Sequence, residues 1–207
     1  GAAAVVLAAL ARAYFYIPGG VRPALQEGEL RVCLNAGGSI ELDWPEAQDS
    51  SASVLYHLSL KSGDAHLQED YSAPGLLLEQ WTLPLEVQVQ PLAERKNLLG
   101  LSRRLTGESL RATVEPADLS APEALGAPGP GTLALSWTQA GQAPDFYDVF
   151  TLKDGQAAYA ATAQGKQLDL TVRKQGGDLT LPGYDHPLQV QVRAGLRGEG
   201  YVLCGPA

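Results

Sequence analysis

Hydrophobic and polar residues alternate along short segments of this chain, and such alternation predicts β-strands joined by tight turns. The clearest segment covers residues 132–138, where Leu133, Leu135 and Trp137 share one face of an extended chain. Asp154-Gly155 then separates two further strand-like segments and is typical of a hairpin turn. Turn residues recur about every ten positions, which is the pattern of an antiparallel β-sandwich. We therefore expect an all-β protein.

The same criteria predict strands along most of the chain, and residues 63–75 are predicted to be a loop. The predicted strands of the first half are 30–34, 39–44, 54–61, 76–82, 85–92 and 98–105, and residues 110–114 either extend the last of them or begin the connector. Those of the second half are 132–138, 145–153, 156–163, 167–173, 188–194 and 201–204.

One pattern occurs twice. Ile40-Glu41-Leu42-Asp43-Trp44 is echoed by Leu133-Ala134-Leu135-Ser136-Trp137, and residues 84–89 (PLEVQV) are echoed by residues 187–192 (PLQVQV). An aromatic segment lies between the members of each pair. The length of 207 residues accommodates two domains of about 100 residues each, so we interpret the pattern as a duplication.

The duplication divides the chain into four parts. They are an apolar N-terminal segment (1–21), a first domain (22–114), a connector rich in Pro, Ala and Gly that contains the first strand of the second domain (115–131), and a second domain (132–207).

The second copy resembles a fibronectin type III domain, in which a Trp lies on the second strand and a Tyr on the third. The residues that carry the resemblance are Ala121-Pro122-Glu123-Ala124-Leu125, Trp137, Tyr147 and Leu181-Pro182-Gly183, with Trp44 and Tyr56 as counterparts in the more divergent first copy. Leu85 and Leu188 stand where this family commonly has an aromatic residue. The resemblance implies two tandem, antiparallel, seven-stranded immunoglobulin-like sandwiches, whose cores contain Trp44, Tyr56, Trp137 and Tyr147. It also implies a non-enzymatic module outside the cytoplasm.

The N-terminal segment is unlike either copy. Residues 2–11 are apolar, but a bilayer-spanning helix needs about 20 such residues. Three interpretations stay open: the remnant of a membrane anchor, the residue of a signal peptide, or an element that packs on this chain or on a neighbouring subunit. The candidate assembly or anchor residues are Val5, Val6, Leu7, Leu10, Tyr14, Phe15 and Tyr16.

Composition narrows the classes of protein. Hydrophobic residues make up 45% of the chain and charged residues 18%, which suits a globular fold. The net charge of -8 argues against nucleic acid as a partner. Cys33 and Cys204 lack zinc-ligand spacing, so they are expected to be either two separate buried thiols or a disulfide that joins distant parts of the chain.

Catalytic and cofactor motifs are missing from the sequence. His57, His66 and His186 have no metal-binding spacing, and the carboxylate pairs 46/49, 69/70 and 145/148 are interpreted as solvated charges near loops. We therefore predict no catalytic residue, no cofactor and no metal. Trp81 has no counterpart in the second copy, so it is a candidate exposed binding aromatic.

The resulting hypothesis is a binding or scaffold module, secreted, periplasmic or at a cell surface, that recognises another protein or a copy of itself. The hypothesis includes a location close to a membrane, reached through the N-terminal segment. Two alternatives are a structural subunit of a surface filament or envelope complex joined through residues 2–17, and an accessory region of a secreted enzyme. The loops expected to mediate recognition are 45–53, 63–75, 139–144 and 176–186.

Overall fold

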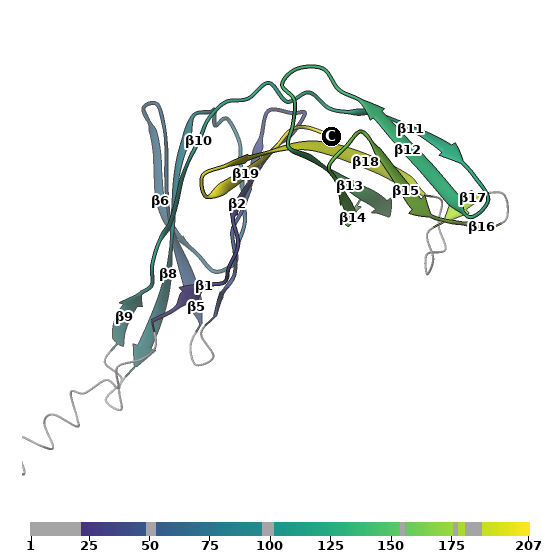
Figure 1. Cartoon of the computed structure of the whole chain (residues 1–207). Coiled ribbons are helices and arrows are strands. Elements are labelled where there is room, and N and C mark those ends of the chain that lie inside the picture. Colours follow the sequence, from purple (N-terminus) through teal and green to yellow (C-terminus); the bar gives the residue numbers. More distant parts are fainter. Residues whose placement is uncertain (1–21, 49–52, 97–101, 154–155, 176–177, 181–187) are drawn as a thin grey trace, which may run out of the picture. The chain divides into compact units, whose positions relative to one another are not determined.

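A computed structural model describes residues 22–48, 53–96, 102–153, 156–175, 178–180 and 188–207. Within these ranges every regular element is a β-strand, so the all-β prediction is confirmed (Figure 1). The sheets are those of an immunoglobulin-like or fibronectin-III-like sandwich. The chain divides into two compact units. The first comprises residues 1–30, 42–76 and 82–115, and the second comprises residues 31–41, 77–81 and 116–207.

The first unit is built on a sheet with the strand order β10-β8-β5-β6, with β9 also paired to β8. All of these pairings are antiparallel. A two-stranded ribbon, β1-β4, accompanies the sheet. The strands are β1 (Ala24–Leu25), β4 (Ala47–Gln48), β5 (Val54–Ser62), β6 (Ala65–Tyr71), β8 (Leu85–Lys96), β9 (Ser102–Thr106) and β10 (Leu110–Val114).

The second unit contains the three-stranded sheet β11-β12-β15 and a seven-stranded sheet ordered β14-β13-β18-β19-β2-β3-β7. Three strands of the seven-stranded sheet come from the first half of the chain: β2 (Leu30–Leu34), β3 (Ile40–Asp43) and β7 (Leu76–Leu78). The others are β11 (Glu123–Pro128), β12 (Thr132–Thr138), β13 (Phe146–Lys153), β14 (Gln156–Ala163), β15 (Gln167–Thr171), β18 (Gln189–Gly198) and β19 (Tyr201–Cys204), with β16 (Arg173–Gln175) and β17 (Asp178–Thr180) as a separate ribbon.

The two halves of the sequence repeat the same topology. The order β10-β8-β5-β6 corresponds strand for strand to β19-β18-β13-β14, and β2-β3-β7 corresponds to β11-β12-β15. The structure therefore reproduces the duplication that the sequence indicates. It differs from two closed tandem sandwiches in one respect, because β2 pairs with β19 within a single sheet.

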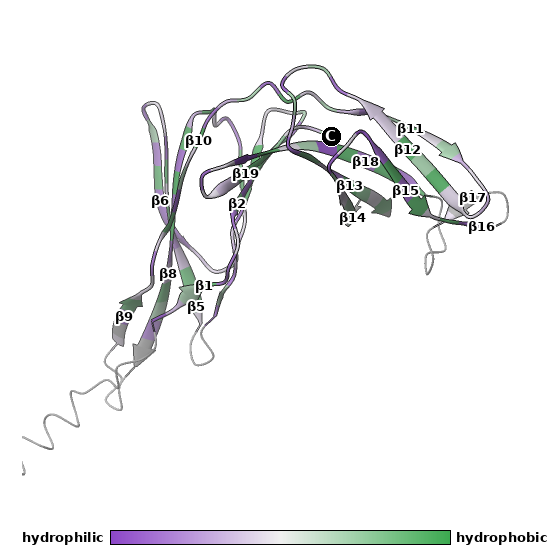
Figure 2. Cartoon of the chain, viewed as in Figure 1, coloured by the Kyte–Doolittle hydropathy of each residue, from purple (hydrophilic) through white to green (hydrophobic). Residues whose placement is uncertain are grey.

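Alternation of apolar and polar residues explains which face of each strand is buried. Along β12 the residues are alternately exposed and buried, and Figure 2 shows this as green bands separated by paler ones. Leu58 and Leu60 of β5 are likewise fully buried while the residues between them are not. Apolar surface removed from water is the main term that stabilises such sheets.

A Trp–Tyr pair lies at the centre of each copy. Trp137 of β12 contacts Tyr147 of β13 edge to face, with 5.2 Å between ring centroids, and so links the two sheets of the second unit. Trp44 and Tyr56 form the same type of contact at 5.8 Å. Each tyrosine hydroxyl also holds a neighbouring segment: Tyr56 accepts a hydrogen bond from the Ala47 amide, and Tyr147 donates one to the Gln139 side chain.

Several secondary-structure predictions were wrong. The predicted loops 45–53 and 176–186 contain the short strands β4 and β17. Residues 65–71, predicted as part of a loop, form strand β6. Most of its side chains are exposed on both faces, so no apolar alternation announces it, and its pairing with β5 defines it instead. The predicted strand 76–82 ends at Leu78. Gln80 has a left-handed backbone (φ 64°), which an extended strand does not accommodate.

Replacing Trp137 with Ala is expected to lower the free energy of unfolding by about 3 to 5 kcal/mol, because the change removes a buried aromatic contact between the two sheets and leaves a cavity. Equilibrium denaturation followed by circular dichroism measures the change. The matched control is Ser136→Ala at the adjacent exposed position of β12, which should alter stability by less than about 0.5 kcal/mol. Equal effects of the two substitutions would contradict the packing role of Trp137.

Candidate functional site

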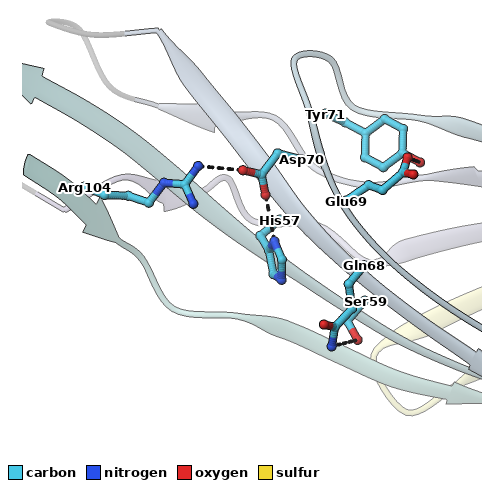
Figure 3. Close-up of polar contacts among 7 residues, drawn as sticks. All are labelled: His57, Ser59, Gln68, Glu69, Asp70, Tyr71 and Arg104. Carbon is cyan, nitrogen blue, oxygen red and sulfur yellow. Dashed lines mark hydrogen bonds and ion pairs between the residues drawn. The ribbon is translucent and has the colours of Figure 1, made fainter. Parts of the chain in front are cut away.

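The first unit presents a polar network on one face of its sheet (Figure 3). The Asp70 carboxylate of β6 accepts a hydrogen bond from Nδ1 of His57 at 2.7 Å and another from Nη2 of Arg104 at 2.6 Å. Cross-strand register produces the first contact, because His57 on β5 lies directly opposite Asp70. Arg104 comes from β9, so three strands contribute to the network.

The same face is polar well beyond this network. Gln68 donates a hydrogen bond to Ser59, and Lys61 forms an ion pair with Glu86 at 3.1 Å. Strand register places these residues on the side of the sheet opposite the buried leucines. We call this surface the open polar face, and its residues are His57, Ser59, Lys61, His66, Gln68, Asp70, Glu86, Gln88, Gln90, Arg104 and Arg111.

The network orders charged groups that stay accessible to solvent. The side chains of His57, Asp70 and Arg104 are 38%, 29% and 57% exposed. The hydrogen bond from His57 is the main reason that the pKa of Asp70 lies below its ordinary value; burial opposes this shift, and the hydrogen bond from Arg104 adds to it. Asp70 is thus held as an anion between two donors. Exposed ion pairs add less than about 1 kcal/mol to stability, so the network contributes little to folding.

The corresponding position of the second unit has a different environment. Asp148 follows Tyr147 as His57 follows Tyr56, and it lies opposite Thr162 on β14 as His57 lies opposite Asp70 on β6. Asp148 is only 2% exposed. Its carboxylate accepts hydrogen bonds from Thr162 and from the guanidinium of Arg31 on β2.

From the sequence, residues 145 and 148 were expected to be solvated charges near loops, and for Asp148 this expectation was wrong. It lies within β13, and the cation that compensates its burial comes from the first half of the chain. No local sequence signal identifies a partner so far away. The alternation in β13 does place Asp148 on the face opposite Tyr147, and an isolated carboxylate between buried aromatic residues is the single hint available in the sequence.

Apolar side chains and arginines extend the covered surface around Asp148. The Phe146 ring lies across Gly195, so closely that an added Cβ would come within 2.2 Å of the ring. Arg197 stands over the same ring at 5.1 Å from its centroid. Arg193, which lies opposite Asp148, donates a hydrogen bond to Asn35, the residue that follows β2, at 3.4 Å.

The two cysteines lie on the same covered surface. Cys33 on β2 and Cys204 on β19 are free, and both are buried in a cluster with Phe146 and Val202. The thiols interact through a hydrogen bond, which is the main reason that the pKa of Cys33 falls to about 7. Both cysteines are therefore free and buried, as one of the two expectations has it, and they belong to one cluster.

The remaining residues singled out by sequence occupy different places. Trp44, Tyr56, Trp137 and Tyr147 are buried in the cores. Trp81 is half-buried, and His66 lies on β6 instead of in a turn. The assembly or anchor candidates in residues 5–16, His186 and most of the loop 176–186 lie outside the described residues.

Chemical groups do not converge elsewhere in the ranges that the structure describes. No group of three or more His, Cys, Asp or Glu side chains among these residues could hold a metal ion. A shallow depression beside β1 and β4 is lined by Ala24, Leu25, Gln26, Glu27 and Gln48, so Glu27 is its ionisable group. The described part of the chain also contains no helix long and apolar enough to span a bilayer.

Comparison with known proteins gives a limited result. No protein-family model matches the chain, and no curated protein matches it. Among solved structures, the FN1–FN3 domains of chicken CNTN1 are similar over 90% of this chain and 67% of that one, with a TM-score of 0.27 and 14% sequence identity. A likeness at this level assigns neither a family nor a function.

Replacing Arg31 with Met is expected to destabilise the protein by about 3 kcal/mol, because Asp148 is then left buried without its cation. The double variant Arg31→Met/Asp148→Leu removes both charges and should recover much of the loss. Denaturant titration of the two variants beside the wild-type protein measures this. A double variant as unstable as the single one would show that the ion pair is not what the burial of Asp148 depends on.

Proposed function

We propose that this chain is a non-enzymatic recognition or scaffold module and that the open polar face is its surface for a protein partner. The observation that supports this proposal most directly is that equivalent positions of the two copies differ in their accessibility to solvent. At Asp148 the outward face is covered by Arg31, whereas at His57 and Asp70 the same position is solvent-accessible and carries an ordered set of donors and acceptors.

Charge and geometry favour a protein over other partners. The chain carries a net charge of -8, and the open polar face alternates acidic, basic and amide groups. Nucleic acid would require a concentrated positive surface. A mixed face with pre-ordered charges instead suits recognition of a complementary protein surface, where such groups determine specificity and the rate of association.

The remaining parts of the proposal concern location and the other aromatic candidate. We propose an extracytoplasmic location, periplasmic, secreted or at a cell surface, on the basis of the fibronectin-III-like sequence features. Trp81 is half-buried, and the part of its ring that reaches solvent makes it a second candidate contact.

Replacing Asp70 with Ala is expected to weaken partner binding at least tenfold, because it releases both His57 and Arg104. Stability should change by less than about 1 kcal/mol, since the pairs are exposed. The measurement uses the immobilised chain and proteins from the cells that produce it, with bound proteins quantified by mass spectrometry and then titrated individually.

Asp169→Ala is the matched control, because Asp169 is an exposed strand carboxylate of the second unit. It should leave binding unchanged. Partners retained equally by wild-type, Asp70→Ala and Arg104→Ala proteins would refute the assignment of the open polar face.

The apolar residues 2–17 support a second proposal, self-association as a structural subunit. Deleting these residues should then convert concentration-dependent assemblies into monomers, because a mainly apolar segment of this length favours association. Light scattering over a concentration series measures the assembly state of the wild-type and shortened proteins. A wild-type protein that is monomeric at every concentration would end this proposal.

A further inference from the structure

Cys33 and Cys204 stand near opposite ends of the sequence, yet the fold places them on the neighbouring strands β2 and β19. Both are free and buried, in one cluster with Phe146 and Val202. Adjacent strands and a shared buried cluster place the two cysteines near one another, and such proximity is what a disulfide requires of the backbone.

The surroundings of the pair favour loss of one proton. The thiol of Cys204 donates a hydrogen bond to Cys33, and the guanidinium groups of Arg31 and Arg193 add positive potential, so that the pKa of Cys33 is lowered to about 7 although burial opposes this. The pKa of Cys204 is raised, because it is the hydrogen-bond donor to Cys33 and is buried. The pair therefore combines one thiolate near neutral pH with one retained proton.

We propose that Cys33 and Cys204 form an oxidation site at which a peroxide converts the two thiols into a disulfide between β2 and β19. This site is independent of the open polar face and does not rest on the function proposed above.

The reaction balances in two steps. The Cys33 thiolate attacks one oxygen of hydrogen peroxide, the O–O bond breaks, and the leaving hydroxide takes up a proton to become water, so that Cys33 becomes a sulfenic acid. The Cys204 sulfur then attacks the Cys33 sulfur, an S–S bond forms, and the hydroxyl group leaves with the Cys204 proton as a second water. In total two thiols lose two electrons and two protons, and one peroxide is reduced to two waters.

The disulfide would tie the first half of the chain to its last strand. A cross-link between such distant residues restricts the unfolded chain strongly, so the oxidised protein should melt on the order of 10 °C higher than the reduced protein. It would also fix the pairing of β2 with β19, which in the reduced protein depends on non-covalent contacts alone.

The test treats the folded wild-type protein with hydrogen peroxide at neutral pH. The expected product is a monomer that has lost two hydrogen atoms, contains a cross-linked pair of peptides with Cys33 and Cys204, melts at higher temperature, and returns to the starting mass with a dithiol reductant. Disulfide-linked dimers, separate oxidation of each cysteine without a cross-link, or oxidation only after unfolding would each overturn the proposal.

Variants identify the role of each thiol. Cys204→Ala should stop the reaction at the sulfenic acid of Cys33, which dimedone traps, whereas Cys33→Ala should leave Cys204 unreactive. If either variant folds poorly, the test is the pH dependence of the rate at which hydrogen peroxide oxidises the wild-type protein. The charged or titratable groups around Cys33 are Arg31, Arg193, Asp148 and Cys204, and the rate should rise as the pH passes about 7. A rise only near the ordinary thiol pKa would overturn the assignment of Cys33 as the attacking group.

Discussion

An antiparallel sheet ends in strands with unpaired backbone N–H and C=O groups, and a protein must cover, shorten or charge such edges to avoid uncontrolled pairing. In this chain the strand β19 would form one of those edges, and β2 pairs with it instead. The polar surface around Asp148 depends on that pairing, since β2 contributes Arg31 and Cys33 and is followed directly by Asn35. One strand pairing thus determines which outward positions of the second unit are covered.

Whether a neighbouring strand covers an outward-facing residue determines which interactions that residue can make. His57 and Asp148 occupy equivalent places beside the core tyrosines, but a buried carboxylate must be compensated within the protein, whereas an exposed one can exchange its partners for those of another molecule. Arg31 performs the compensation at Asp148. Asp70 receives a similar guanidinium from Arg104 and nevertheless stays accessible. The duplicated topology therefore provides one closed and one open version of a single polar arrangement.

Much of the fold could be predicted from the sequence, because alternation reports directly which face of a strand is buried. The limits of 30–34, 156–163 and 201–204 were predicted to the residue. Strand β6 was missed because neither of its faces is apolar, so its position depends on pairing with β5. The pairing of β2 with β19 was missed for a related reason: backbone hydrogen bonds between distant strands leave no periodic signal in side chains.

The polar contacts of the candidate site could not be predicted without knowing which distant strands pair. Charges next to turns and charges within strands look alike in a sequence, so Asp70 and Asp148 were both assigned to solvent, although one is ordered by two neighbours and the other is buried. Likewise, the large separation of Cys33 and Cys204 argued for independent thiols until the strand order brought them together. Each of these pairs joins residues on different strands, so it can be identified only once the strand order is known.

The core aromatic residues repeat between the copies because the core of each sandwich must be filled, whereas the outward-facing positions are free to differ. Functional divergence within a duplicated β-protein is therefore best sought on the outward faces of equivalent strands, where packing imposes the fewest constraints.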